Sequence, residues 1–152
     1  MRACRRALVH VNVTANPTAA WVWRQLIEAT PWSQKPHHLL RDRDAVYGRE
    51  FRKRAQRMVS TPSPHPSTRQ RPTPSRKRVI GTLRRECLNH VIVLDEQHLR
   101  LVLAEFVRYY NQERPHRTLG LQTPQVKERP TTGSVRSHPV LNGLHHVYER
   151  AA

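Results

Sequence analysis

The sequence has few cysteines, few acidic residues and no long apolar run. Cys4 and Cys87 are the two cysteines among 152 residues, too few and too far apart for a disulfide framework or a cysteine zinc site. No apolar stretch approaches the roughly 20 residues that span a membrane, and the first residues lack the apolar core and cleavage site of a signal peptide. These absences predict a cytoplasmic protein with reduced cysteines and no membrane partner.

The shortage of acidic residues leaves a large positive charge. Eleven Asp and Glu residues stand against 27 Lys and Arg residues, which gives a formal charge of +16 at pH 7. Such a chain favours polyanions, because each neutralised phosphate releases condensed counterions. Arg greatly outnumbers Lys, and its planar guanidinium suits two-point contacts with phosphate. The composition therefore favours a nucleic acid as partner over a basic surface that contacts only solvent.

The first third of the chain has the pattern of alternating strands and helices. Residues 8–13 alternate apolar and polar side chains, as a half-buried strand does. Pro17 after Asn16 is typical of a helix start with Asn16 as the N-cap. A short apolar step at 38–40 predicts a second strand, and 48–58 predicts a basic helix. This order predicts an α/β layer.

Two helices are predicted in the second half. An apolar stripe over 79–87 predicts one, and a stronger stripe predicts another that starts near Asp95. We expect the two to pack as an antiparallel pair joined near Leu94. The second stripe consists of Leu99, Val102, Leu103, Phe106, Val107 and Tyr110.

The sequence beyond Pro124 has little periodicity and predicts a flexible tail over 126–152. Its His138, His145 and His146 are more typical of solvated side chains than of metal ligands.

A proline-rich segment separates the two halves. Residues 57–78 read RMVSTPSPHPSTRQRPTPSRKR, with five prolines and no acidic residue. Proline breaks helices and cannot donate a hydrogen bond to a neighbouring strand. Residues 58–77 are therefore predicted to be disordered.

Three blocks of the sequence carry a resemblance. They are VHVNVTANPTAAWVWRQLIEATPW, LLRDRDAVYGREF and RVIGTLRRECLNHVIVLDEQHLRLVLAEFVRYYNQERPHRTLGLQTP. The third block is specific, since Tyr-Tyr-Asn, Arg-Pro-His, Leu-Gly and Thr-Pro follow one another between Tyr109 and Pro124. The blocks resemble the catalytic domain of insertion-sequence DDE transposases and retroviral-type integrases. The resemblance covers about residues 7–125 apart from the proline-rich segment, and implies an RNase H-like fold with a mixed sheet between helices.

The resemblance implies three carboxylates that hold two divalent ions, Mg²⁺ or Mn²⁺, which activate a water or a DNA 3′-hydroxyl for strand cleavage and transfer. Asp42 matches the second acid, with Tyr47 five residues later, and Asp44 is the rival. No Asp or Glu precedes Glu28, so the first acid has no counterpart and the chain is expected to be truncated at its N-terminus. Lys77 stands where the family has its Glu, and its ammonium would repel the ions. Asp42 alone makes an incomplete metal site.

The spacing from Asp42 to Lys77 matches the family although the intervening residues do not. Two compensating frameshifts, one near Met58 and one within the Glu codon, would keep the length and replace the content. The shifted frame can be read as GIDTVSTPIHAPTPNAVAE, which ends on the expected Glu. A selected flexible basic linker is the alternative.

The sequence thus predicts an α/β, partial RNase H-like fold with its first strand missing and its centre disordered. Its parts are the N-terminal core at 7–57, the proline-rich segment at 58–77, the C-terminal helices at 78–125 and the tail at 126–152.

The predicted function is that of an inactive remnant of an integrase or transposase catalytic domain, whose inherited role is DNA integration and transposition. One alternative is a small basic nucleic-acid-binding protein, and another is a partner of an intact transposase relative. Whether the chain forms a homo-oligomer is left open. The arginines predicted to contact nucleic acid are Arg76, Arg78, Arg84, Arg85, Arg114 and Arg117.

Overall fold

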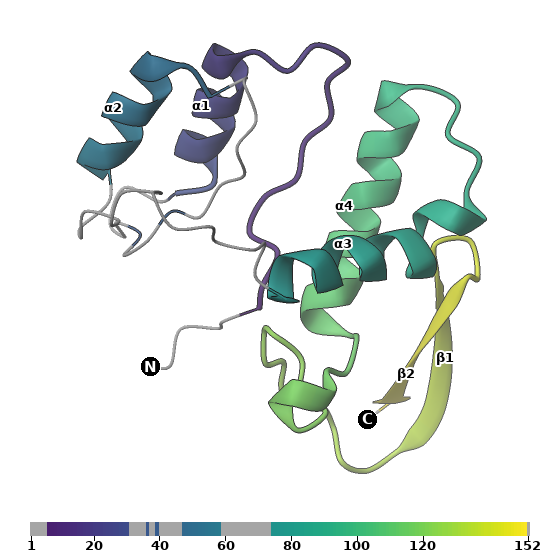
Figure 1. Ribbon diagram of the computed structural model, residues 1–152. Helices are drawn as coiled ribbons and strands as arrows, with labels where there is room; N and C mark the ends of the chain where they lie inside the picture. The colour runs from purple at the N-terminus through teal and green to yellow at the C-terminus, as the bar shows by residue number, and fades with distance from the viewer. Residues whose placement is uncertain (1–5, 31–35, 37–38, 40–46, 59–73, 152) are drawn as a thin grey trace. The chain divides into compact units, whose positions relative to one another are not determined.

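A computed structural model describes residues 6–30, 36, 39, 47–58 and 74–151 (Figure 1). The chain divides into two compact units, one of Thr14–Val79 and one of Met1–Val13 with Ile80–Ala152. The helices are α1 (Ala19–Glu28), α2 (Arg49–Met58), α3 (Pro74–Glu86) and α4 (Glu96–Gln112), the strands β1 (Ser134–Val140) and β2 (His145–Ala151), and the 3₁₀ turns η1 (Leu88–His90) and η2 (Arg117–Leu119).

Helices α1 and α2 lie in the smaller unit, which also includes the first residues of α3 up to Val79. α1 begins after Thr18, whose extended backbone and hydroxyl, which accepts from the Trp21 N–H at 3.2 Å, make it the N-cap. The prediction that Asn16 is the cap was wrong. Thr18 lies three residues before Trp21, which is the spacing at which an N-cap side chain accepts from a backbone N–H of the first turn. α2 follows its prediction, with Phe51 buried edge-on against Trp23 at 5.9 Å between ring centroids.

Helix α4 supplies the core of the larger unit. Asp95 caps it by accepting from the His98 N–H at 2.7 Å, which confirms the predicted start. The predicted apolar stripe is also confirmed, since Leu103, Phe106 and Tyr110 are buried. Phe106 is 1% exposed and lies in one cluster with Cys87, which is fully buried.

Helix α3 crosses α4 within this unit and does not run antiparallel to it (Figure 1). Leu83 and Cys87 pack against Phe106 as predicted, but the antiparallel arrangement was wrong. The chain leaves α3 at Cys87, passes through η1 and reaches α4 only after Asp95. Antiparallel helix hairpins use connections of about two to five residues, whereas this longer connection permits a crossing.

The N-terminal segment over residues 8–13 is extended and is held by side chains of α4. The Leu8 N–H donates to Asn111 Oδ1 and the Asn111 Nδ2 donates to the Leu8 carbonyl, both at 2.9 Å. At the other end Arg100 Nη2 donates to the Val13 carbonyl at 2.9 Å. The predicted strand is not formed here, because amide and guanidinium groups of α4 occupy backbone positions that a neighbouring strand would pair with.

The lengths of these two segments agree. Eleven helical steps from Arg100 to Asn111 span about 16 Å, and five extended steps from Leu8 to Val13 span about 16 Å. The segment therefore runs antiparallel to α4, with both of its ends tied down.

The C-terminal residues form an antiparallel hairpin in which Ser134 pairs with Ala151 and Val140 with His145. Asn142 and Gly143 make the turn with φ of 53° and 88°, the positive sign that a type I′ turn requires. Leu141 is buried in the cluster with Phe106. The prediction of a flexible tail over 126–152 is therefore corrected over 134–151, because the Asn-Gly turn and the buried Leu141 anchor it.

Both ends of the segment predicted to be disordered, residues 58–77, lie within helices, so its predicted bounds are corrected there. Met58 ends α2, and α3 begins at Pro74. Proline suits the first turn of a helix, where its missing N–H has no intrahelical partner. Residues 59–73 lie outside the described part of the chain, as do residues 38 and 40 of the predicted second strand.

The described helices and two-stranded sheet agree with the predicted combination of helix and strand. Among these residues the strands form only the hairpin, and the predicted mixed sheet is not seen. None of the helices described is both long and apolar enough to cross a membrane.

Candidate nucleic-acid interface

The exposed arginines of α3 make the clearest cationic surface among the predicted site residues. Arg78, Arg84 and Arg85 are all exposed, and Arg78 and Arg85 lie seven residues apart on the same helix face. The guanidinium of Arg85 folds back over Gly81, since its Nη1 lies 2.9 Å from the point where a side chain at that residue would begin. This fold-back moves the charge of Arg85 one turn toward Arg78.

The other arginines predicted to contact nucleic acid, Arg76, Arg114 and Arg117, lie at three different places. Arg76 and Lys77 lie in the first turn of α3, and Arg117 is exposed in η2. Arg114 is committed elsewhere: its Nε and Nη2 donate to the two carboxylate oxygens of Glu86, each at 2.6 Å. The structure thus gives Arg114 a structural role, and its predicted contact with nucleic acid stays a prediction.

The pair of Glu86 and Arg114 joins the end of α3 to the segment after α4. The two side chains are only 28% and 23% exposed, and the Arg114 guanidinium also lies 5.8 Å from the centre of the Tyr110 ring. The hydrogen bonds to Glu86 raise the pKa of Arg114 above its ordinary value, against the opposing effect of burial. Two parallel charge-assisted bonds make this a strong polar contact.

Asn111 and His116 act as internal connectors in the same region. Besides its two bonds to Leu8, Asn111 accepts from the Gln125 N–H through its backbone carbonyl at 2.8 Å. His116 is buried, and its Nε2 lies 3.1 Å from the Tyr110 carbonyl. The segment from Tyr109 to Pro124, singled out by its motif, therefore builds the end of the core, a role that the motif alone did not assign.

The contacts of His116 fix its tautomer. A carbonyl only accepts, so Nε2 carries the proton, and Nδ1 lies 3.4 Å from Arg114 Nη1, which only donates. The contact with Arg114 requires neutral imidazole, because a protonated Nδ1 could only donate. Burial lowers the pKa of His116, with Arg114 and Arg6 lowering it further, while the Tyr110 hydrogen bond and Glu86 act in the opposite direction.

His145 was predicted to be solvated, and this prediction was wrong. Its ring stacks on Tyr109 at 4.5 Å with an angle of 7° between the planes. Its Nε2 also donates to the Glu86 carbonyl at 2.7 Å, so the histidine joins the hairpin to the end of α3. His138 and His146 are exposed, as predicted.

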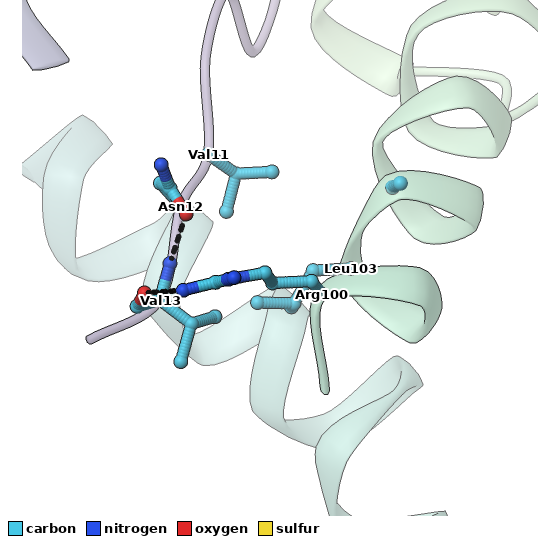
Figure 2. Close-up of a pocket in the computed structure, with 6 residues that line it drawn as sticks. Val11, Asn12, Val13, Arg100 and Leu103 are labelled. Carbon is cyan, nitrogen blue, oxygen red and sulfur yellow. Dashed lines mark hydrogen bonds between the residues drawn. The ribbon is translucent and has the colours of Figure 1, made fainter. Parts of the chain in front are cut away.

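A hollow of about 250 Å³ lies between the N-terminal segment and α4 (Figure 2). Figure 2 shows Arg100 extending from the helix to the Val13 carbonyl across this hollow. The lining contains no carboxylate and its one cation is already bonded to the backbone, so it has no catalytic groups. It is lined by Val11, Asn12, Val13, Arg100, Leu103 and Ala104.

The acidic residues do not assemble a metal site in the described part of the chain. No group of three or more His, Cys, Asp or Glu side chains there is placed to hold an ion. Asp42 and Asp44 lie outside the described residues, and Lys77, which the resemblance predicts to stand at the family Glu position, lies in the first turn of α3. A cation in that position does not fit a divalent metal, and we derive no catalytic step through one.

Residues 74–124, about a third of the chain, match the family model of the integrase core domain. The matched segment runs from the start of α3 through α4 to Pro124 and includes the pair of Glu86 and Arg114. No curated protein and no solved structure matches the chain.

Proposed function

We propose, from the match of residues 74–124 to the integrase core domain, that this protein is an inactive remnant of an integrase or transposase catalytic domain. The inherited role is DNA integration and transposition, and the ancestral fold is RNase H-like. The observation that carries the proposal is this match, which spans a continuous folded segment with the Tyr109–Pro124 motif at its end.

The loss of catalysis is argued from Lys77. It lies in the first turn of α3, at the position of the family Glu, and Asp42 keeps the position of the second acid. The N-terminal end of a helix carries a partial positive charge, which adds to the ammonium. Two positive contributions would replace one negative ligand, so a divalent ion beside a phosphate would lose the oxygen donor it requires.

The test is a DNA nicking and strand-transfer assay with purified protein in Mg²⁺ and in Mn²⁺. We expect no metal-dependent turnover by the natural sequence. Asp42→Asn is the control, since it removes the carboxylate that matches the second acid. Metal-dependent nicking that disappears in Asp42→Asn would show that the catalytic site works.

A second candidate function is non-catalytic DNA binding, which the exposed arginines of α3 support. Arg78, Arg84 and Arg85 present three guanidinium groups on one short helix, and the overall charge of +16 would attract the phosphates to them. DNA is also the partner that an integrase-type domain implies.

Duplex binding by a variant that removes two charges from α3, compared per charge with a variant that removes one charge from α4, tests this candidate. Arg84→Ala with Arg85→Ala should weaken duplex binding and reduce the salt slope by about 1 for each lost phosphate contact. Arg108, exposed on α4, provides a control that removes charge outside α3. Equal weakening per charge by Arg108→Ala would show that only net charge matters.

A further inference from the structure

The two faces of the C-terminal hairpin differ in exposure along β2, whereas β1 is exposed on both faces except at Val140. Directly opposed residues share a face, and Val135 opposes Arg150, Ser137 opposes Tyr148, and Pro139 opposes His146. These six residues form what we call the outer face. Along β2 the exposed residues are His146, Tyr148 and Arg150, while those between them are half-buried.

On the inner face, the turn and the residues of β2 are held against the rest of the unit. His145 stacks on Tyr109, and Leu141 at the turn enters the core cluster. Glu149 accepts a hydrogen bond from Lys127 at 2.8 Å, and Lys127 also lies 3.8 Å from Glu113. In Figure 1 the hairpin extends beside the C-terminal half of α4, and these contacts fix which face points outward.

The outer face combines an exposed aromatic ring with one guanidinium group and contains no acid. Tyr148 is 64% exposed, an unusual position for a large ring on a small sheet. Arg150 lies two residues away on the same strand, and it donates through Nη1 to the Gly133 carbonyl at 3.1 Å, which orients its side chain. His146 lies two residues away in the other direction. The acid of this strand, Glu149, is on the inner face and is paired.

We propose that the outer face binds single-stranded nucleic acid, with one base stacked on Tyr148 and the backbone phosphates beside it contacting Arg150. An aromatic ring takes any base because every base has a flat π-face, and a neighbouring guanidinium supplies the charge attraction. Stacking needs an unpaired base, so the proposal is for a single strand. The hairpin lies outside residues 74–124, so this site does not follow from the integrase core match.

A second copy of the chain is the rival occupant of this face. Two chains of +16 would have to meet with Arg150 on both sides, which like charges oppose. Pro139 has no N–H with which to donate to an added strand. The charge therefore selects a polyanion over a self-contact.

The experiment uses the full chain with short single-stranded DNA and RNA that contain iodouracil, a base that crosslinks to a stacked aromatic ring under ultraviolet light. Mass spectrometry of the crosslinked peptide should identify Tyr148. Tyr148→Ala should weaken binding, measured by fluorescence anisotropy, by roughly fivefold to hundredfold. Tyr148→Phe keeps the ring and should bind within about twofold of the natural sequence if stacking carries the contact.

Arg136 provides the matched charge control, since it lies on the inner face of the same hairpin opposite Glu149. Arg150→Ala should weaken single-strand binding more than Arg136→Ala. Equal effects of these two variants, equal binding by Tyr148→Ala and the natural sequence, or crosslinks that map away from β2 would each overturn the proposal. The proposal would also be overturned if Tyr148→Ala or Arg150→Ala changed the oligomeric state of the protein without changing its affinity for nucleic acid.

The α3 variants keep this test separate from the proposed function. Arg84→Ala with Arg85→Ala should leave the Tyr148 crosslink in place even where it lowers duplex binding. Loss of the crosslink in that variant, with the circular dichroism spectrum unchanged, would show that the hairpin has no site of its own.

Discussion

Arg114 forms an ion pair with Glu86 and so connects two parts of the fold. In sequence they are 28 residues apart, and the structure closes that distance to two bonds of 2.6 Å. Because both side chains are mostly shielded from water, neither could lose its partner without leaving a poorly solvated charge.

Removing this arginine should destabilise the protein. We expect Arg114→Ala to lower the free energy of unfolding by about 1–3 kcal/mol, because Glu86 is left without its charge-assisted hydrogen bonds. Arg117→Ala removes the same charge from an exposed position and should change it by less than about 0.5 kcal/mol. Urea denaturation of the three proteins measures both, and equal losses would contradict a structural role for Arg114.

His116 should make stability depend on pH. Its folded-state pKa is lowered, mainly by burial, so between that value and the unfolded pKa near 6.5 the unfolded chain binds more protons. Stability should therefore fall as the pH drops below about 6.5, by at most about 1.4 kcal/mol per pH unit from this group. His116→Gln keeps a donor toward Tyr110 and removes the titration. Its urea midpoint should fall less between pH 7 and pH 5, and parallel profiles would refute the assignment.

Elements differed in how well the sequence predicted them. The start and the buried face of α4 were predicted because both signals are local. Asp95 lies directly before the helix, and the apolar residues recur with the helical period. The hairpin was missed because β1 is exposed along almost its whole length and shows no alternation. The Asn142-Gly143 turn was the available signal, since that pair is typical of two-residue hairpin turns.

Helix α3 has cations at its positive end, and reversing that charge should stabilise it. Its first turn contains no acid and includes Lys77, whereas Arg84 lies in the last turn, where a cation is favourable. We expect Lys77→Glu to raise the free energy of unfolding by about 0.3–1 kcal/mol at low salt, and Arg84→Glu to lower it by a similar amount. Both variants change the net charge equally, so shifts of the same sign in denaturation curves would attribute the effect to net charge and contradict this prediction.

At the scale of the whole molecule, composition predicts the charge, whereas the roles of single side chains depend on partners that are distant in sequence. Composition alone gave the charge of +16, and the exposed arginines of α3 could be read from one helix. The role of Arg114 could not be predicted from sequence, because it depends on Glu86, which lies 28 residues away and is brought near only by the crossing of α3 and α4. The docking of the tail depends likewise on the distant Glu86 and Tyr109.

The charge of the molecule predicts a steep salt dependence of DNA binding. The logarithm of the association constant should fall linearly with the logarithm of the salt concentration. Even about four phosphate contacts give a loss of roughly hundredfold over a fourfold rise in salt. Anisotropy titrations with random-sequence duplexes measure the slope, and an affinity unchanged by salt would refute counterion release as the source of binding.

The attachment of Leu8 to Asn111 has a consequence for synthesis on the ribosome. These residues are 103 positions apart, and both hydrogen bonds between them require Asn111, near the end of α4, to have been synthesised. At about 5–20 residues per second, Leu8 emerges roughly 5–20 seconds before its partner has been made. During that interval Leu8 and Val13, which are half-buried in the folded protein, have no helix to pack against. A nascent chain of this protein should therefore be a substrate for ribosome-associated chaperones until translation has passed Asn111.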